Sequence, residues 1–152
     1  MIHLEKVDGS NYRIFIKLKV KDEQKRFVAN NSNILAKAYA YYNDSTVYGI
    51  YNDDSAVGLA FAREYADDNC YIFDQLMIDE KYQGKGYGKK ATELILKDLK
   101  DKNKYNKILL CYVEGDETAK NLYSSFGFEH TGIIDVCDDG TKEIDMALKL
   151  IY

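Results

Sequence analysis

The segment Leu76-Met77-Ile78-Asp79-Glu80-Lys81-Tyr82-Gln83-Gly84-Lys85-Gly86-Tyr87-Gly88 decides the fold of this chain. It begins as an apolar strand, turns through three glycines at alternate positions and continues into a helix that we predict from about Tyr87. The first N–H groups of a helix have no partner inside the helix, and glycine lets an anion approach them closely. The segment therefore predicts an anion site at a strand-to-helix turn, where Lys85 and Lys89 add positive charge.

The glycine spacing excludes the two common nucleotide-binding loops. The dinucleotide fingerprint requires glycine where Lys89 stands, and the P-loop requires Ser or Thr after its Gly-Lys pair, where this chain has Gly86. For the turn taken by itself, a tight connection with flexible glycines and no ligand is the alternative interpretation.

Several strands and short helices are expected before the turn. Residues 46–51, 56–64 and 71–78 read as an antiparallel meander, because the loop at 52–55 has hairpin length. A strand at 2–7 comes first, followed by a helix capped by Ser10 or Asn11. Two further short helices, the first from Asp22, are expected to meet at 30–33, with Ser32 or Asn33 capping the second.

After the turn, the pattern alternates between helices and strands. A long helix presents Tyr87, Ala91, Leu94, Ile95 and Leu99 on one face, and a strand at 107–113, a helix at 117–126 and a hairpin of strands at 129–136 and 143–150 follow. This order predicts an α/β (α+β) fold in which helices pack on the faces of a mixed sheet. The length fits one hydrophobic core, so we expect a single domain over residues 1–152.

Charge and composition narrow the function classes. The net charge of −4 argues against nucleic acid as a partner, and no run of 18 apolar residues predicts a membrane span. Cys70, Cys111 and Cys137 are too far apart for a disulfide framework, which fits a reducing cytoplasm. His3 and His130 have no further ligand at metal-binding spacing, so we expect no metal.

A second informative segment lies downstream of the glycine turn: Ala119-Lys120-Asn121-Leu122-Tyr123-Ser124-Ser125-Phe126-Gly127-Phe128. The two segments resemble the V-x-x-x-Y-(Q/R)-G-x-G-x-G and A-x-x-L-Y-x-x-x-G-F motifs of the GNAT (Gcn5-related) N-acetyltransferase family. The resemblance covers almost the whole chain and implies the GNAT fold, a mostly antiparallel sheet of about seven strands with about four helices on its two faces. It also implies acetyl-CoA as the cosubstrate.

The resemblance assigns roles to matched positions. Backbone N–H groups of the glycine turn would hold the CoA pyrophosphate, the strand end would pair with the pantetheine arm, and the N–H of Ile78 would face the thioester oxygen. Tyr123 would protonate the departing CoA thiolate, with a core aromatic as the alternative. Many relatives have asparagine where Asp116 stands, and the nearby Asn121 occupies a position without an assigned role. The cofactor candidates are Leu76, Met77, Ile78, Gln83, Gly84, Lys85, Gly86, Tyr87, Gly88, Lys89, Asp116, Asn121 and Tyr123.

The acceptor amine needs a base or a water relay, because an alkylamine is mostly protonated at neutral pH. Asp74 occupies the place where some polyamine acetyltransferases of the family have a catalytic glutamate. It interrupts an apolar strand, and alternation puts it on the same face as Leu76 and Ile78, so a salt-bridged core residue is an equal alternative.

Residues 22–39 resemble the E-x-Q-x-x-F-V-x-x-N-x-x-S-(I/L)-A-x-A stretch of bacterial spermine/spermidine acetyltransferases, with Asn33 in place of the serine. The resemblance implies transfer to a polyamine or similar small cationic amine by direct attack in a ternary complex, with Glu23 and Asp74 holding its ammonium groups. A solvated helix-start acid is the alternative for Glu23. The rival functions are a protein N-terminal or lysine acetyltransferase and a non-catalytic CoA-binding regulatory module. Dimers are common among similar proteins, so a homodimer is also an option.

Overall fold

The computed structural model describes residues 1–151 and contains a seven-stranded sheet in the order β1-β2-β3-β4-β5-β7-β6. The strands are β1 (Ile2–Lys6), β2 (Ser45–Asn52), β3 (Ser55–Tyr65), β4 (Cys70–Ile78), β5 (Lys107–Val113), β6 (Glu129–Val136) and β7 (Lys142–Lys149). The helices are α1 (Tyr12–Ile16), α2 (Asn31–Ala40), α3 (Tyr87–Asp101) and α4 (Glu117–Ser125), with single 3-10 turns at Asp22–Gln24, Ala66–Asp68 and Glu80–Tyr82. All neighbouring strands are antiparallel except β4 and β5.

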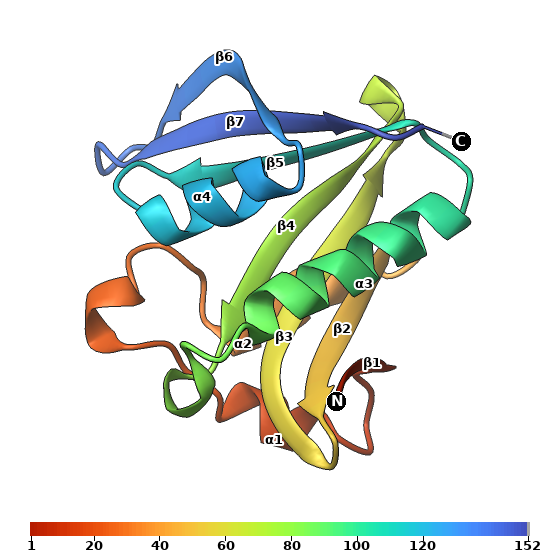
Figure 1. The fold of residues 1–152 in the computed structure, drawn as a ribbon, viewed down its shortest axis with the longest axis vertical. Coiled ribbons are helices and arrows are strands. Elements are labelled where there is room, and N and C mark those ends of the chain that lie inside the picture. Colours follow the sequence, from red (N-terminus) through yellow and green to blue (C-terminus); the bar gives the residue numbers. More distant parts are fainter. Residues whose placement is uncertain (152) are drawn as a thin grey trace.

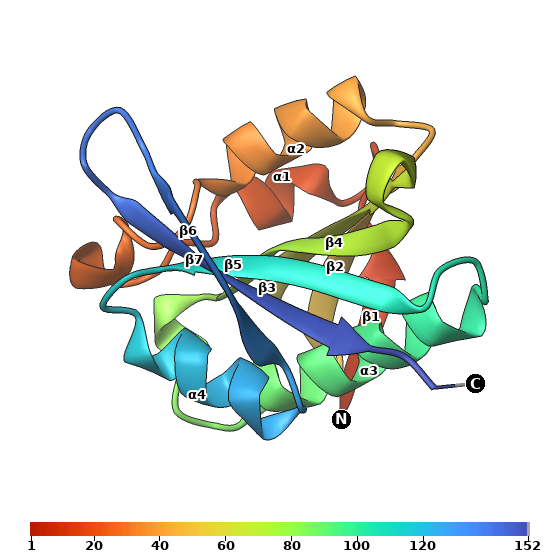
Figure 2. The ribbon, with the colours of Figure 1, turned by 90° about the horizontal axis from the view of Figure 1, so that it is seen from above.

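The helices cover both faces of the sheet. Helices α1 and α2 lie on one face, and α3 and α4 lie on the other (Figure 2). The predicted mixed, mostly antiparallel sheet with helices on both faces is therefore confirmed, as are the meander of β2, β3 and β4 and the hairpin of β6 and β7.

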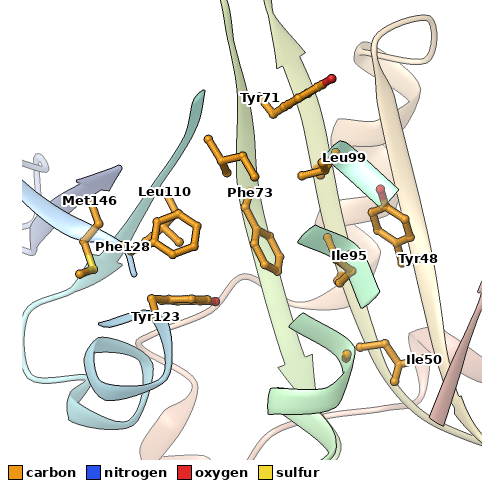
Figure 3. Packing of buried hydrophobic residues seen from close by; sticks show 14 of the residues in the cluster. Tyr48, Ile50, Tyr71, Phe73, Ile95, Leu99, Leu110, Tyr123, Phe128 and Met146 are labelled. Atoms are coloured by element: carbon orange, nitrogen blue, oxygen red, sulfur yellow. The ribbon is translucent and has the colours of Figure 1, made fainter. Parts of the chain in front are cut away.

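Two apolar clusters hold these layers together. Under α3 and α4, Ile95, Leu99 and Tyr123 pack against Phe73 and Leu110 of the sheet (Figure 3). Under α1 and α2, the buried residues include Phe15, Ile34, Leu59, Phe61 and Met77. Burial of such side chains is the main stabilising contribution to the fold.

Strands β4 and β5 separate soon after they meet. Their parallel pairing is confined to Tyr71 with Ile108 and Ile72 with Leu109, and the strands then diverge (Figure 1). The edge of β4 beyond Ile72 is therefore left without a strand partner on the β5 side, which places open backbone groups ahead of the glycine turn.

The chain between α1 and α2 differs from the prediction. Residues 22–28 form no second α-helix, since the backbone bonds there join Gln24 to Lys21, Lys25 to Asp22 and Phe27 to Gln24, each three residues apart. Phe27 and Val28 therefore do not lie on a helix face; their apolar side chains line a cleft.

The caps of the first two helices also differ in part from the prediction. Helix α2 begins earlier than predicted, because the side chain of Asn30, and not Ser32 or Asn33, accepts from the N–H of Asn33 at 2.8 Å. Asn11 is the N-cap residue of α1, as one of the two alternatives proposed, but its side chain makes no cap bond and instead donates to the Lys6 carbonyl.

A bulge in β4 overturns the predicted orientation of Asp74. The register opposite β3 shifts from Phe61 with Gln75 to Ala62 with Phe73, so Asp74 is an extra residue that breaks the alternation. Its carboxylate meets Lys37 of α2, whereas Leu76 and Ile78 pack on the α3 side. Asp74 therefore lies on the opposite face from these two residues.

Candidate active site

A cleft of about 550 Å³ opens where β4 and β5 separate. Its walls come from the end of β4, the glycine turn, the first part of α4 and the segment between α1 and α2. The lining residues are Val20, Lys21, Gln24, Phe27, Val28, Leu76, Met77, Ile78, Tyr82, Gln83, Gly84, Gly86, Tyr87, Gly88, Lys89, Asp116, Thr118, Ala119, Leu122 and Tyr123. The cleft thus gathers most of the cofactor candidates named from the sequence; Lys85 and Asn121 are exposed and lie outside this lining.

The end of β4 presents open donors to the cleft. The N–H of Asp79 donates to the Val57 carbonyl of β3 at 2.8 Å. Since backbone N–H groups alternate in direction along a strand, those of Leu76 and Ile78 point away from β3, toward the gap left by β5. These groups can bind a carbonyl or amide laid along the strand.

The glycine turn has the backbone of an anion cradle. Gly84 and Gly86 have φ values of 78° and 81°, in the left-handed region that glycine tolerates best, and Gly86 caps α3 without a side-chain bond. A Cβ built at either glycine would meet nothing within 4 Å, so the space in front of them is free. The first α3 backbone bond runs from Lys90 to Gly86, which leaves the preceding N–H groups open for an anion.

Tyr123 projects from α4 toward β4 (Figure 3). Its ring packs edge-on against Phe73 and Phe128, with centroid distances of 5.8 Å in both cases. Within residues 1–151 its hydroxyl has no hydrogen-bond partner, although every buried side-chain oxygen and nitrogen there has one, so the hydroxyl is open to the cleft. Burial, and then the charge of Asp116, raise the pKa of Tyr123, so the phenol keeps its proton at neutral pH and can donate it.

Asp116 stands at the start of α4 and lines the cleft. Its Oδ1 accepts from the N–H of Ala119 at 3.1 Å, which caps the helix. Burial raises the pKa of this carboxyl despite that bond and despite the nearby charge of Arg26.

Similarity to a known protein family identifies the fold of the chain and the type of reaction it catalyses. Residues 12–128 match the model of the acetyltransferase (GNAT) family. The chain belongs to this family. It is therefore a GNAT acetyltransferase, an enzyme that moves an acyl group, and the family uses acetyl-CoA.

Individual relatives agree with the family assignment. The spermine/spermidine N(1)-acetyltransferase of Bacillus subtilis is 32% identical over 142 residues, which cover 88% of this chain and 91% of that protein. The spermidine N-acetyltransferase of Vibrio cholerae, solved with CoA and spermine, superposes with a TM-score of 0.78 at 16% identity and covers 97% of this chain and 95% of that one. The ribosomal-protein-S18-alanine N-acetyltransferase of Escherichia coli gives 0.77 at 17% identity, with 100% and 96% covered. The similarity to these two solved structures shows a shared fold.

The acceptor-side candidates of this GNAT chain lie outside the cleft lining. Asp74 Oδ2 lies 2.6 Å from Lys37 Nζ and 3.3 Å from Arg63 Nε, and Glu23 is exposed. Two cations thus satisfy the carboxylate that interrupts the apolar strand, which favours the salt-bridged alternative for Asp74.

Several cleft residues were not singled out from the sequence, among them Gln24, Phe27, Val28, Thr118 and Leu122. Gln24, Phe27 and Val28 belong to the stretch that resembles spermine/spermidine acetyltransferases, so a signal was present. The local pattern predicts a helix, and nothing in the local sequence indicates that this segment contacts the glycine turn.

Between residues 1 and 151, no group of three or more His, Cys, Asp or Glu side chains could hold a metal ion. Over the same residues, no helix combines the length and apolar character needed to cross a membrane.

Proposed function

We propose that this enzyme transfers the acetyl group of acetyl-CoA to a primary amine of a polyamine such as spermidine or spermine. One observation carries the proposal: a single cleft collects the open N–H groups of β4, the glycine turn at the start of α3 and the free hydroxyl of Tyr123. These are the three groups that acyl transfer from a CoA thioester requires, at the thioester oxygen, the pyrophosphate and the leaving sulfur.

The reaction follows from these placements. The pyrophosphate sits on the N–H groups of residues 83–88, and the pantetheine arm lies along Leu76, Met77 and Ile78. The amine enters neutral, after its ammonium form has given one proton to water. The amine nitrogen attacks the thioester carbonyl carbon, and a C–N bond forms while the oxygen gains negative charge that the strand N–H groups stabilise. The C–S bond then breaks and the thiolate takes the proton of the Tyr123 hydroxyl, while the second proton of the attacking nitrogen passes to the Tyr123 phenolate and restores the phenol.

A polyamine acceptor is supported by the relatives and by charge. The Bacillus subtilis relative is named for spermine and spermidine, and it aligns over most of both chains. The net charge of −4 favours a cationic substrate at long range, and Asp116 puts a carboxylate in the cleft wall. We propose Asp74 as a residue that organises the acceptor side rather than as the base, because Lys37 and Arg63 occupy its carboxylate.

A thiol-release assay with acetyl-CoA tests the proposal over spermidine, spermine, putrescine, a free amino acid, an aminoglycoside and a peptide with a free N-terminus. Turnover with the polyamines, and an acetylated polyamine identified by mass spectrometry, is the expected result. Turnover on the peptide alone would replace the polyamine with a protein N-terminus. Binding of acetyl-CoA without turnover on any amine would point to a non-catalytic CoA-binding module.

A further inference from the structure

The segment of residues 19–29, here called the strap, contributes residues to the cleft lining. It lies on the same side of the molecule as the glycine turn and α4 (Figure 1). It is tied at three places. The N–H of Lys19 donates to Asp79 at 2.9 Å, Gln24 pairs with Gln83, and Gln75 donates to the Ala29 carbonyl at 2.9 Å. Gln75 belongs to β4 and Asp79 follows its end, so the pair of Gln24 and Gln83 is the contact that joins the strap to the glycine turn itself.

The middle tie is a reciprocal amide pair. Gln24 Nε2 donates to Gln83 Oε1 at 3.1 Å, and Gln83 Nε2 donates to Gln24 Oε1 at 2.9 Å. Gln83 Nε2 also donates to the Ile78 carbonyl at 2.9 Å, and Gln24 Oε1 also accepts from the N–H of Lys21 at 3.1 Å. Since an amide nitrogen has two N–H donors, the side chain of Gln83 has none left for a phosphate. Its side chain therefore binds the strap, while its backbone faces the anion site.

The far side of the strap reaches α4. A Cβ built at Gly115 would lie 3.5 Å from the Arg26 guanidinium and 4.0 Å from the Phe27 ring, and Gly115 directly precedes the Asp116 cap of α4. Phe27 and Val28 line the cleft between these two anchors. Any change in the position of Gln83 therefore acts on the cleft wall that carries these apolar side chains.

We infer that Gln24 is a positioning residue, which holds the strap to the cofactor turn and thereby couples acetyl-CoA binding to the shape of the acceptor side. The inference rests on the proposed function, because it takes the turn as the CoA site. Gln24 acts through Gln83, which also donates to the Ile78 carbonyl, so removal of Gln24 weakens CoA binding no more than removal of Gln83 does, and removal of both weakens it no further than removal of Gln83.

Titration of CoA by calorimetry into the wild type, Gln24→Ala, Gln83→Ala and the double variant tests this coupling. Gln24→Ala is expected to bind about five- to tenfold more weakly, the effect of one net hydrogen-bond contribution, Gln83→Ala at least as weakly, and the double variant like Gln83→Ala. Asp22→Asn, on the exposed ion pair with Lys25 of the same strap, is the matched control and should bind like the wild type. Thermal unfolding of each variant checks that it is folded.

Replacing both glutamines with oppositely charged residues gives a second test, whose result would not change if Gln24 only stabilised the fold. Gln24→Glu alone places a negative charge beside the turn and should weaken CoA binding, whereas Gln24→Glu with Gln83→Arg restores an ion pair and should recover it beyond Gln83→Arg alone. In kinetics, Gln24→Ala should raise the KM for acetyl-CoA and for the amine together, with a smaller change in kcat.

Two results separate the possible failures. Wild-type affinity in Gln24→Ala, or losses in Gln24→Ala and Gln83→Ala that add in the double variant, would overturn the coupling and leave the CoA site intact. A wild-type protein that binds no CoA would instead overturn the proposed function on which the coupling rests.

Discussion

The surroundings of each side chain in the cleft determine what that side chain can do chemically. Tyr123 is one of 14 tyrosines in the chain, and it differs from the others in its environment. Its ring is fixed between Phe73 and Phe128, and its hydroxyl, at the cleft, has no hydrogen-bond partner among residues 1–151. The raised pKa keeps the phenol protonated at neutral pH and also makes it a weaker acid, so proton transfer has to accompany the growth of negative charge on the departing sulfur.

Tyr123→Phe should keep the ring packing and remove only the proton donor. We expect kcat to fall by about 10²- to 10⁴-fold, while the affinity for acetyl-CoA and the melting temperature stay close to those of the wild type. Steady-state kinetics and calorimetry measure the two effects. Unchanged turnover would make Tyr123 a core aromatic and nothing more.

Asp116→Asn should change the pH dependence of stability in a defined direction. The folded state raises the pKa of Asp116 above its ordinary value of 3.8, so its stabilising contribution is complete below that value and is lost as pH rises through the raised pKa. Asparagine also caps helices, so the variant keeps the α4 cap. The free energy of unfolding of the wild type minus that of Asp116→Asn, from urea titrations at several pH values, should therefore fall as pH rises. A difference that grows with pH would contradict the assignment.

At the scale of elements, the decisive features are a turn and a bulge. The turn before α3 needs two glycines with positive φ, and the bulge in β4 sends Asp74 to the α2 side. The first could be predicted from the sequence, since glycine adopts positive φ at the least cost and alternate glycines between a strand and a helix are typical of such a turn. The second could not, because a bulge depends on the register with β3 and leaves no residue signature in Phe73-Asp74-Gln75.

Gly86→Ala should disable the turn. The left-handed backbone at φ 81° is expected to cost about 1 to 2 kcal/mol with any Cβ, and the added methyl group projects into the open space beside the turn. CoA affinity should therefore fall by more than the loss of stability explains. Gly9→Ala, where the Cβ meets nothing and no positive φ occurs, is the matched control. Equal CoA binding by both variants would be inconsistent with an anion site at this turn.

Asp74→Asn should loosen the attachment of α2 to the sheet. It leaves Lys37 and the half-buried Arg63 without a counter-charge, and we expect a loss of about 1 to 2 kcal/mol in unfolding free energy, less than for a fully buried pair. Chemical denaturation measures this loss, and Asp101→Asn, on the exposed pair with Lys97, should change the unfolding free energy little.

The same variant also tests the kinetic role of Asp74. Because we place Asp74 outside the proton path, the pH profile of kcat should keep its shape in Asp74→Asn. Loss of the acid-side limb, on which activity rises with pH as a base deprotonates, would return Asp74 to the role of base.

At the scale of the whole molecule, the order of elements followed from local patterns, but the cleft did not. The meander, the long helix after the glycines and the final hairpin each have their own signals in periodicity and turn residues. The separation of β4 from β5 and the contacts of the strap join residues far apart in sequence, such as Gln24 and Gln83. Such contacts depend on the packed fold, so local patterns predict a helix from Asp22 where the structure has a cleft wall with Phe27 and Val28.

A crystal structure of the enzyme with acetyl-CoA and spermidine tests the central claim most directly. The account predicts the pyrophosphate on the N–H groups of residues 83–88, the pantetheine arm along the end of β4, the thioester sulfur near the Tyr123 hydroxyl, and a spermidine amine facing the thioester carbon. A cofactor bound away from the glycine turn, with that turn empty, would contradict it.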